Sequence, residues 1–93
     1  MKKLIRLDSI PIPVNGLYVK ELGDTIIILS DNGDELHSLD EVGGFIWRSI
    51  NGSSTVQDII VMLLQEYDVG KSQAEEDIKN FLFELEEKKL IKI

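Results

Sequence analysis

The stretch Leu39–Ile60, LDEVGGFIWRSINGSSTVQDII, divides the chain into two parts with different sequence patterns. Short apolar runs typical of β-strands precede it, and apolar residues at helical spacing follow it. The stretch contains the only tryptophan, Trp47, and two helical patterns separated by Asn51-Gly52, which we expect to end the first helix. Gly43-Gly44 is unfavourable inside a helix and favours tight packing of that helix on the second helix or the sheet. This order of patterns predicts a small α+β fold with the strands first.

The residues before this stretch predict a three-stranded antiparallel β-meander. Ile26–Leu29 is a β-branched apolar run of the kind found in a central strand. We expect a tight turn at Gly23 before it and a hairpin at Asn32-Gly33 after it, because Asn-Gly tolerates the positive φ of a type I′ turn. The last strand has no predicted neighbour on its outer side and is a candidate free edge. The predicted strands cover residues 17–22, 25–30 and 35–38.

Three α-helices are predicted downstream, which makes the fold winged-helix-like with its sheet placed first. Each helix begins with the pattern of a capping box, a hydroxyl residue followed three positions later by an acid. Pro11 and Pro13 should keep residues 1–16 extended, so we assign these as a lead-in and residues 17–93 as a single domain. The tail Leu90–Ile93 is expected to pack on the sheet as a short strand. The three boxes are Ser38 to Glu41, Thr55 to Asp58 and Ser72 to Glu75.

The composition argues against several classes of function. The chain has 93 residues, enough for one domain, and its net charge of −7 disfavours non-specific binding to nucleic acid. It has no cysteine, which excludes disulfides, thiolate metal sites and cysteine nucleophiles. No apolar run approaches the roughly 20 residues of a membrane span, and Arg6 and Asp8 interrupt the run that an export signal would need. We therefore expect a cytoplasmic protein without a membrane segment.

No set of side chains predicts catalysis, a metal site or a cofactor. His37 is the only histidine, and no residues at suitable spacing build a triad or a ligand set around it. The carboxylates of the last helix are expected to form a solvated face with ion pairs such as Glu84 with Lys88. We therefore predict a protein that is not an enzyme. Trp47 either covers a groove or closes the core, and Phe83 points away from the apolar face of its helix, where it suits a contact with a partner.

Three segments, taken in order, resemble the PqqD family, the small proteins of coenzyme PQQ synthesis, and its relatives, the RiPP precursor peptide recognition elements. The segments are LDEVGGFIWRSING, TVQDIIxxLLxxYDV and EEDIxxFLxxLxxxxLI, and they extend over most of residues 25–91. Each segment alone is an ordinary helical pattern. Their order and their short spacers carry the resemblance.

The resemblance implies a non-catalytic adaptor, or peptide chaperone, that binds the leader segment of a ribosomally made precursor peptide and presents it to modifying enzymes. In the family the leader adds as a strand to the edge of the third strand and lies against the third helix, a mode that suits a short free edge. The implied partners are modifying enzymes: a leader protease and cyclase of a lasso peptide, which are favoured, or a radical-SAM enzyme. Carried over to this sequence, the peptide-binding residues are Glu35, Leu36, His37 and Ser38 on the strand, and Asp77, Ile78, Phe81, Glu84 and Leu85 on the helix.

Two other functions stay open at this point. A winged-helix, DNA-associated regulator would read DNA with a basic helix, whereas the last helix here has an excess of acidic residues. A plain oligomerisation or scaffold domain, including a homodimer, would use the same free edge. The strand-addition hypothesis predicts that His37→Pro removes one backbone donor from the edge and weakens peptide binding while the helices still form.

Overall fold

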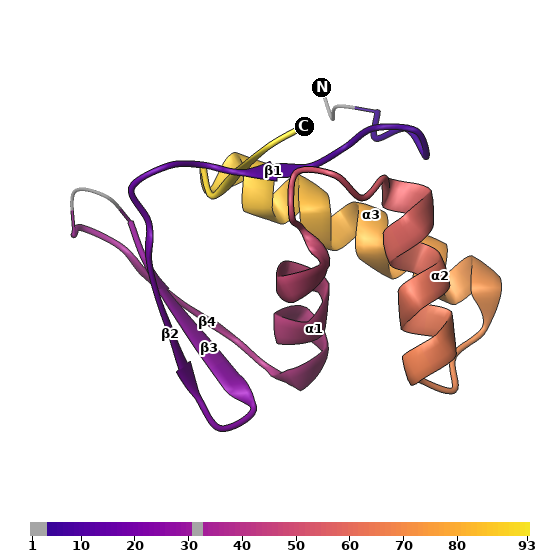
Figure 1. The fold of residues 1–93 in the computed structure, drawn as a ribbon, viewed down its shortest axis with the longest axis horizontal. Coiled ribbons are helices and arrows are strands. Elements are labelled where there is room, and N and C mark those ends of the chain that lie inside the picture. The colour runs from indigo at the N-terminus through magenta and orange to yellow at the C-terminus, as the bar shows by residue number, and fades with distance from the viewer. Residues whose placement is uncertain (1–3, 31–32) are drawn as a thin grey trace.

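The computed structural model describes residues 4–30 and 33–93. Along the chain the elements are β1 (Ile12–Pro13), β2 (Tyr18–Leu22), β3 (Thr25–Leu29), β4 (Leu36–Leu39), α1 (Glu41–Ser49), α2 (Val56–Glu66), α3 (Lys71–Glu87) and β5 (Ile91–Lys92). A three-stranded antiparallel sheet is followed by three helices, which confirms the predicted α+β fold class. Helix α1 lies between the sheet on one side and α2 on the other (Figure 1).

The strands β2, β3 and β4 pair antiparallel in that order, so β3 is central as predicted. The turn predicted at Gly23 is confirmed, since the β2–β3 ladder closes across a two-residue loop in which Gly23 has a φ of 63°. In the second hairpin the Gly33 N–H donates to the Ser30 carbonyl at 2.9 Å, and Gly33 has a φ of 75°. The predicted type I′ turn involves Asn32, which lies outside the described residues. The third strand covers residues 36–39 and not 35–38.

The two ends of the chain form a second, two-stranded sheet. Ile12 of β1 pairs with Lys92 of β5, and the Val14 N–H donates to the Leu90 carbonyl at 3.0 Å. The expectation that the tail packs on the three-stranded sheet is therefore wrong. The reason is positional: α3 ends beside the lead-in, so the short β5 reaches β1 and not an edge of the larger sheet (Figure 1).

The lead-in also caps the second helix. The carbonyls of Ser9 and Leu7 accept hydrogen bonds from the N–H groups of Val56 and Gln57 at 2.9 and 3.0 Å. These bonds satisfy two of the free donors that every helix has at its start. Ile5 is buried in the common core. The division of the chain at residue 16 stays a prediction, but the lead-in and the domain share one core.

The core lies on both sides of α1. Gly44 brings this helix close to the sheet, since a Cβ on Gly44 would lie 3.2 Å from Cδ1 of Ile26. The predicted tight packing on the sheet is thus confirmed for Gly44, whereas Gly43 packs against Phe81 of α3. Trp47 is only 8% exposed, so of its two predicted roles it closes the core. The fully buried aliphatic side chains include Ile26, Ile28, Val56, Ile59, Ile60, Ile78, Leu82, Leu85, Leu90 and Ile91.

One predicted capping box forms and two do not. At α2 the Thr55 hydroxyl accepts from the Asp58 N–H at 3.1 Å, and the Asp58 carboxylate accepts from the Thr55 N–H at 3.0 Å. Helix α1 has Asp40 as its N-cap instead of Ser38. Ser38 is unavailable because it is held in β4 by the pairing with β3.

The other helix ends also differ from the prediction. Helix α3 starts after Gly70 without a side-chain cap, so Ser72 lies inside the first turn rather than at the N-cap. Helix α1 is closed by Ile50 in an extended conformation, so it ends before the predicted stop at Asn51-Gly52. Gly52 has the expected left-handed conformation, with a φ of 80°, but in the loop that follows the helix.

Candidate functional site

The outer edge of β4 has backbone groups that are directed away from the sheet. The Ser30 N–H donates to the Glu35 carbonyl at 3.0 Å, which makes these two residues a hydrogen-bonded pair at the end of the β3–β4 ladder. Bonded and non-bonded pairs alternate along an antiparallel ladder. In the observed register, Leu36 and Ser38 fall in non-bonded pairs. Their N–H and C=O groups therefore point outward, as an added strand would require.

His37 has the opposite orientation. It lies across from Ile28 in a bonded pair, so its N–H is directed to β3. The expectation that His37→Pro removes an outward donor is therefore wrong, because that donor belongs to Leu36 and Ser38. The His37 side chain points to the inner face of the sheet and is 11% exposed. Its Nε2 lies 3.4 Å from Oε2 of Glu35 but forms no hydrogen bond within the described residues.

Two cavities lie on the side of α3, one at the C-terminal end of β4 and one at Glu35 before its N-terminal end, and we call them together the β4–α3 groove. The first has a volume of about 380 Å³ and the second about 510 Å³, and Lys88 lines both. The first cavity is lined by Thr25, Ser38, Leu39, Asp40, Gly43, Phe81, Glu84 and Lys88. The second cavity is lined by Val14, Asn15, Leu17, Ser30, Glu35, Glu87, Lys88 and Lys89.

Most residues that line the first cavity are polar or charged, and Leu39, Gly43 and Phe81 form its apolar floor. Phe81 of α3 approaches α1 closely there, since a Cβ on Gly43 would lie 3.3 Å from Cζ of Phe81. The ring is half-buried, so part of it stays open to the groove. Ile78 and Leu85, which were predicted to bind peptide, are buried in the core at 0% and 2% exposure. These two side chains hold α3 in place beneath Phe81 and do not line the groove.

Unpaired charges of both signs line the groove. Glu84 and Lys88 are four residues apart on α3, but the ion pair predicted between them is absent. Across residues 4–30 and 33–93, neither side chain has a hydrogen bond or an ion pair. Asp40 adds a second carboxylate to the first cavity, where its Oδ1 accepts from the Gly43 N–H at 2.8 Å. The apolar floor is thus bordered by charged groups that are free to bind an occupant.

The structure brings four of the nine predicted binding residues to this groove, namely Glu35, Ser38, Phe81 and Glu84. Leu36 and Ser38 provide outward backbone groups, whereas Asp77 accepts a hydrogen bond from Gln73 at 2.8 Å and lines neither cavity. The remaining predicted residues divide into Phe81, Glu84 and Glu35 in the groove, and His37, Ile78 and Leu85 directed inward.

Sequence reasoning missed Asp40, Gly43 and Lys88 as lining residues. A signal for Lys88 was present, because it follows Glu84 by four residues and so continues the stripe of α3 that contains Phe81. Asp40 and Gly43 were not detectable in this way, since they reach the groove only through the close contact of α1 with α3.

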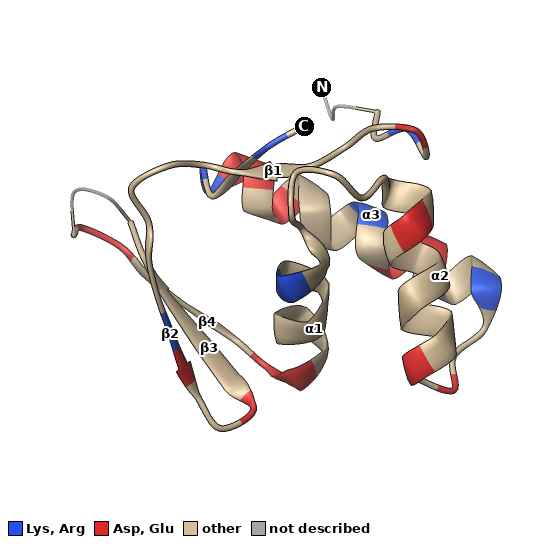
Figure 2. Ribbon diagram, viewed as in Figure 1, with Lys and Arg blue, Asp and Glu red and all other residues tan. Residues whose placement is uncertain are grey.

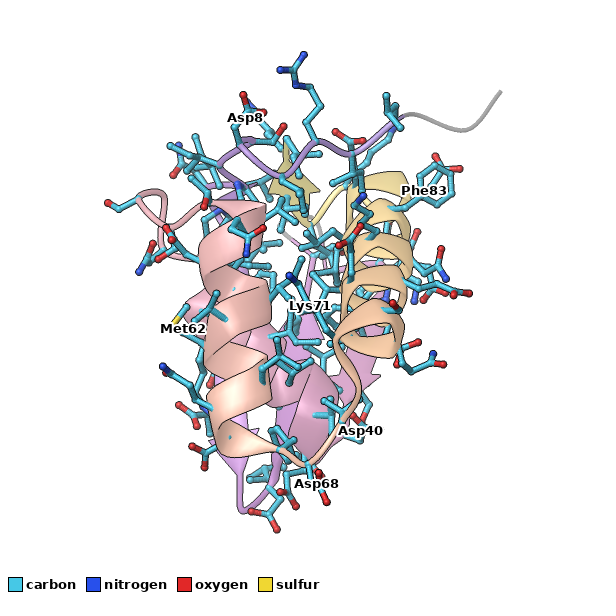
Figure 3. All side chains as sticks on the ribbon, turned by 90° about the vertical axis from the view of Figure 1, so that its right-hand side faces the viewer. Asp8, Asp40, Met62, Asp68, Lys71 and Phe83 are labelled. Carbon is cyan, nitrogen blue, oxygen red and sulfur yellow. The ribbon has the colours of Figure 1, made fainter. Side chains whose placement is uncertain are left out.

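Phe83 is not an isolated exposed aromatic. It is half-buried and packs against the core. The side chain projects from the side of α3 that faces away from α2 (Figure 3). This packing explains why an aromatic side chain occurs at position 83 without a contact to another protein. A partner contact at the exposed part of the ring stays a prediction.

Shifted pKa values are found at two places away from the groove, at Tyr67 and at the ion pair of Arg6 with Asp8. Desolvation, followed by the hydrogen bond from the Tyr67 hydroxyl to Oε2 of Glu41 at 3.2 Å, raises the pKa of Tyr67 above its ordinary value of 10.0. The hydrogen bond and the charge of Arg6 lower the pKa of Asp8 below 3.8. The first interaction joins α1 to the end of α2 and the second lies in the lead-in, so both serve the fold.

Acidic residues occur on either side of β4 and along α3 (Figure 2). Within the part of the chain that the structure describes, no three His, Asp or Glu residues come together as metal ligands would. Some of the carboxylates have partners, as Glu75 does with Lys79 at 3.2 Å. None of the described helices is both long and apolar enough to cross a lipid bilayer.

Residues 25–91 match the sequence model of the family described as Coenzyme PQQ synthesis protein D (PqqD). A solved structure of TbiB1 in complex with the TbiA(beta) leader peptide is similar with a TM-score of 0.81 and 23% identity, over 87% of this chain and 94% of that one. A structure of lasso peptide synthetase B1 complexed with the leader peptide has a TM-score of 0.81 and 19% identity, over 91% of this chain and 100% of that one. No curated protein matches the sequence. The two structures establish a common fold.

Proposed function

We propose, from the premise that this chain belongs to the PqqD family, that it is a peptide-binding adaptor with no catalytic activity of its own. The adaptor binds the leader segment of a ribosomally made precursor peptide and presents the remainder to modifying enzymes. One observation carries the proposal: the outward backbone groups of Leu36 and Ser38 lie beside a groove with an apolar floor. That combination suits an extended peptide that adds to the sheet and places side chains in the groove.

The edge alone supplies part of the affinity. The N–H and C=O groups of Leu36 and Ser38 offer four backbone hydrogen bonds to an added strand. At about 0.5–1.5 kcal/mol net for each bond, they contribute roughly 2–6 kcal/mol. A micromolar complex corresponds to about −8 kcal/mol. The remainder has to come from peptide side chains buried on Phe81 and the groove walls, and these must also offset the entropy lost on association.

The similar structures support a leader peptide as the ligand. Both are complexes with a leader peptide, and both share the fold of this chain. On that basis we expect the ligand to be the leader of a lasso-peptide precursor. The expected enzyme partners are a leader protease and a cyclase, rather than a radical-SAM enzyme, acting in the cytoplasm.

A backbone-resolved titration tests the proposal. The ¹⁵N-labelled protein is titrated with the leader half, and separately with the core half, of a precursor peptide encoded beside its gene. We expect the leader half to bind with micromolar or tighter affinity and to shift the amide signals of residues 36–39 and of α3. The core half should cause no shifts. Leader-induced shifts confined to other elements, or no shifts at all, would refute the proposed site.

A further inference from the structure

Two unpaired charges in the β4–α3 groove bear on which peptide it accepts. Glu84 and Lys88 have the i, i+4 spacing at which opposite charges on a helix commonly pair. Here they pair neither with each other nor with any other described residue, although both line the first cavity. Both groups are therefore available to an occupant of the groove.

The groove has a direction. Phe81 lines the first cavity together with Leu39, at the C-terminal end of β4. Lys88 also lines the second cavity together with Glu35, which precedes the N-terminal end of β4. Helix α3 thus runs antiparallel to β4 along the groove. A peptide that continues the antiparallel sheet beside β4 runs in the direction of α3 and passes Phe81, Glu84 and Lys88 in that order.

The spacing of these three residues matches that of alternate residues in a strand. Glu84 and Lys88 are about 6 Å apart along the helix axis at 1.5 Å per residue, and two strand residues span about 6.7 Å. Phe81 and Glu84 are about 4.5 Å apart along the axis, a difference that flexible side chains can absorb. Side chains on one face of the added strand can therefore meet the three residues in turn.

We propose that the recognised leader contains an apolar, a basic and an acidic residue at alternate positions, in the order apolar-x-basic-x-acidic. This inference rests on the proposed function and specifies its substrate. The apolar side chain covers Phe81, the basic one binds Glu84 beside Asp40, and the acidic one binds Lys88. The charges that line the two cavities fit this order. The first cavity has two carboxylates and one lysine, and the second has two carboxylates and two lysines. The groove therefore becomes less negative toward the position of the acidic residue.

The test uses a phage-displayed library of random peptides of about 12 residues, long enough to extend through the groove. The library is selected on the wild type and on the charge-exchanged variant Glu84→Lys/Lys88→Glu. Weaker binding to Ser38→Pro identifies the peptides that add to the edge, and one of these is synthesised for calorimetry. The control variant Lys71→Glu/Glu76→Lys exchanges charges on α3 outside the groove and also keeps the net charge.

We expect wild-type selections to enrich the apolar-x-basic-x-acidic order. Exchanging the two charges in the peptide should weaken its binding by roughly 3- to 10-fold. The charge-exchanged protein should prefer the exchanged peptide, and the control variant should behave as the wild type.

Edge-dependent peptides without this charge order, or a charge-exchanged protein with the wild-type preference, would overturn the inference and leave the proposed function intact. If the control variant changes its peptide preference as much as the charge-exchanged protein does, the preference comes from the overall charge of the protein and not from the groove. That result would also overturn the inference. If no selected peptide depends on Ser38, the proposed function fails and the inference fails with it.

Discussion

Substituting proline for Ser38 should weaken leader binding without unfolding the domain. The change removes an N–H that the register directs away from β3. Proline is tolerated on an edge strand when its missing N–H faces solvent. One net hydrogen bond is worth about 0.5–1.5 kcal/mol, so the dissociation constant for the leader should rise by about 2- to 12-fold.

Two matched variants separate the backbone effect from other effects. Ser38→Ala keeps the N–H and loses only the hydroxyl, so its affinity should stay within about 2-fold of the wild type. His37→Pro removes an N–H that is directed to β3 across from the buried Ile28. This variant should lower the free energy of unfolding by roughly 1–3 kcal/mol, because a carbonyl inside the sheet loses its donor.

Calorimetry with the leader half of the neighbouring precursor measures the affinity of each variant. Urea denaturation followed by the fluorescence of the buried Trp47 measures the free energy of unfolding. The reasoning is refuted if Ser38→Pro binds as tightly as the wild type. It is also refuted if Ser38→Pro lowers the free energy of unfolding as much as His37→Pro is expected to do, because the Ser38 N–H would then face β3.

Three further predictions concern the fold. Thr55→Ala should lower the free energy of unfolding by about 1 kcal/mol, because it removes the hydroxyl that caps α2; the control Ser53→Ala should not. Lys89→Gly should raise the free energy of unfolding by about 0.5–1 kcal/mol, because Lys89 has a φ of 62° at the end of α3 and glycine relieves that strain. A lower free energy of unfolding in urea denaturation would contradict this. Glu41→Gln should lower the pKa of Tyr67, because it removes the carboxylate that accepts from the Tyr67 hydroxyl. An absorbance titration of a variant with no other tyrosine measures this pKa. An unchanged pKa would exclude the carboxylate as a cause of the shift. Since the folded pKa is raised, the contribution of Tyr67 to stability is complete below about pH 10 and is lost as the pH rises through that pKa.

The elements that could be predicted from sequence are those with local determinants. The capping box at Thr55 is complete within four residues, and the structure confirms it. The box at Ser38 has the same local pattern but does not form, because strand β4 continues through Leu39 and α1 starts from Asp40 instead. The pairing of β1 with β5 was missed for a related reason, since it joins the two ends of the chain.

The binding residues could be predicted only to the level of the element that carries them. The family resemblance carried Ile78, Phe81, Glu84 and Leu85 over to α3 as binding residues, but the rotation of α3 on the core decides which of them reach the groove. On the strand, the phase of hydrogen bonding decides which amides face outward. Which amides face outward follows from the register in which β3 and β4 pair across the second hairpin. The residue types of the two strands do not reveal that register.

Asp40 joins the edge of the sheet to the floor of the groove. It is the single residue between β4 and α1, and its carboxylate caps α1 through the N–H of Gly43, the glycine that admits Phe81. A peptide that adds to the edge therefore meets a groove already fixed beside it, which reduces the ordering that binding requires. Backbone bonds along the edge do not depend on the sequence of the peptide, whereas the charges of Glu84 and Lys88 do discriminate between side chains. Because these contributions come from different elements, substitutions on α3 can change the preferred peptide without changing the mode of binding.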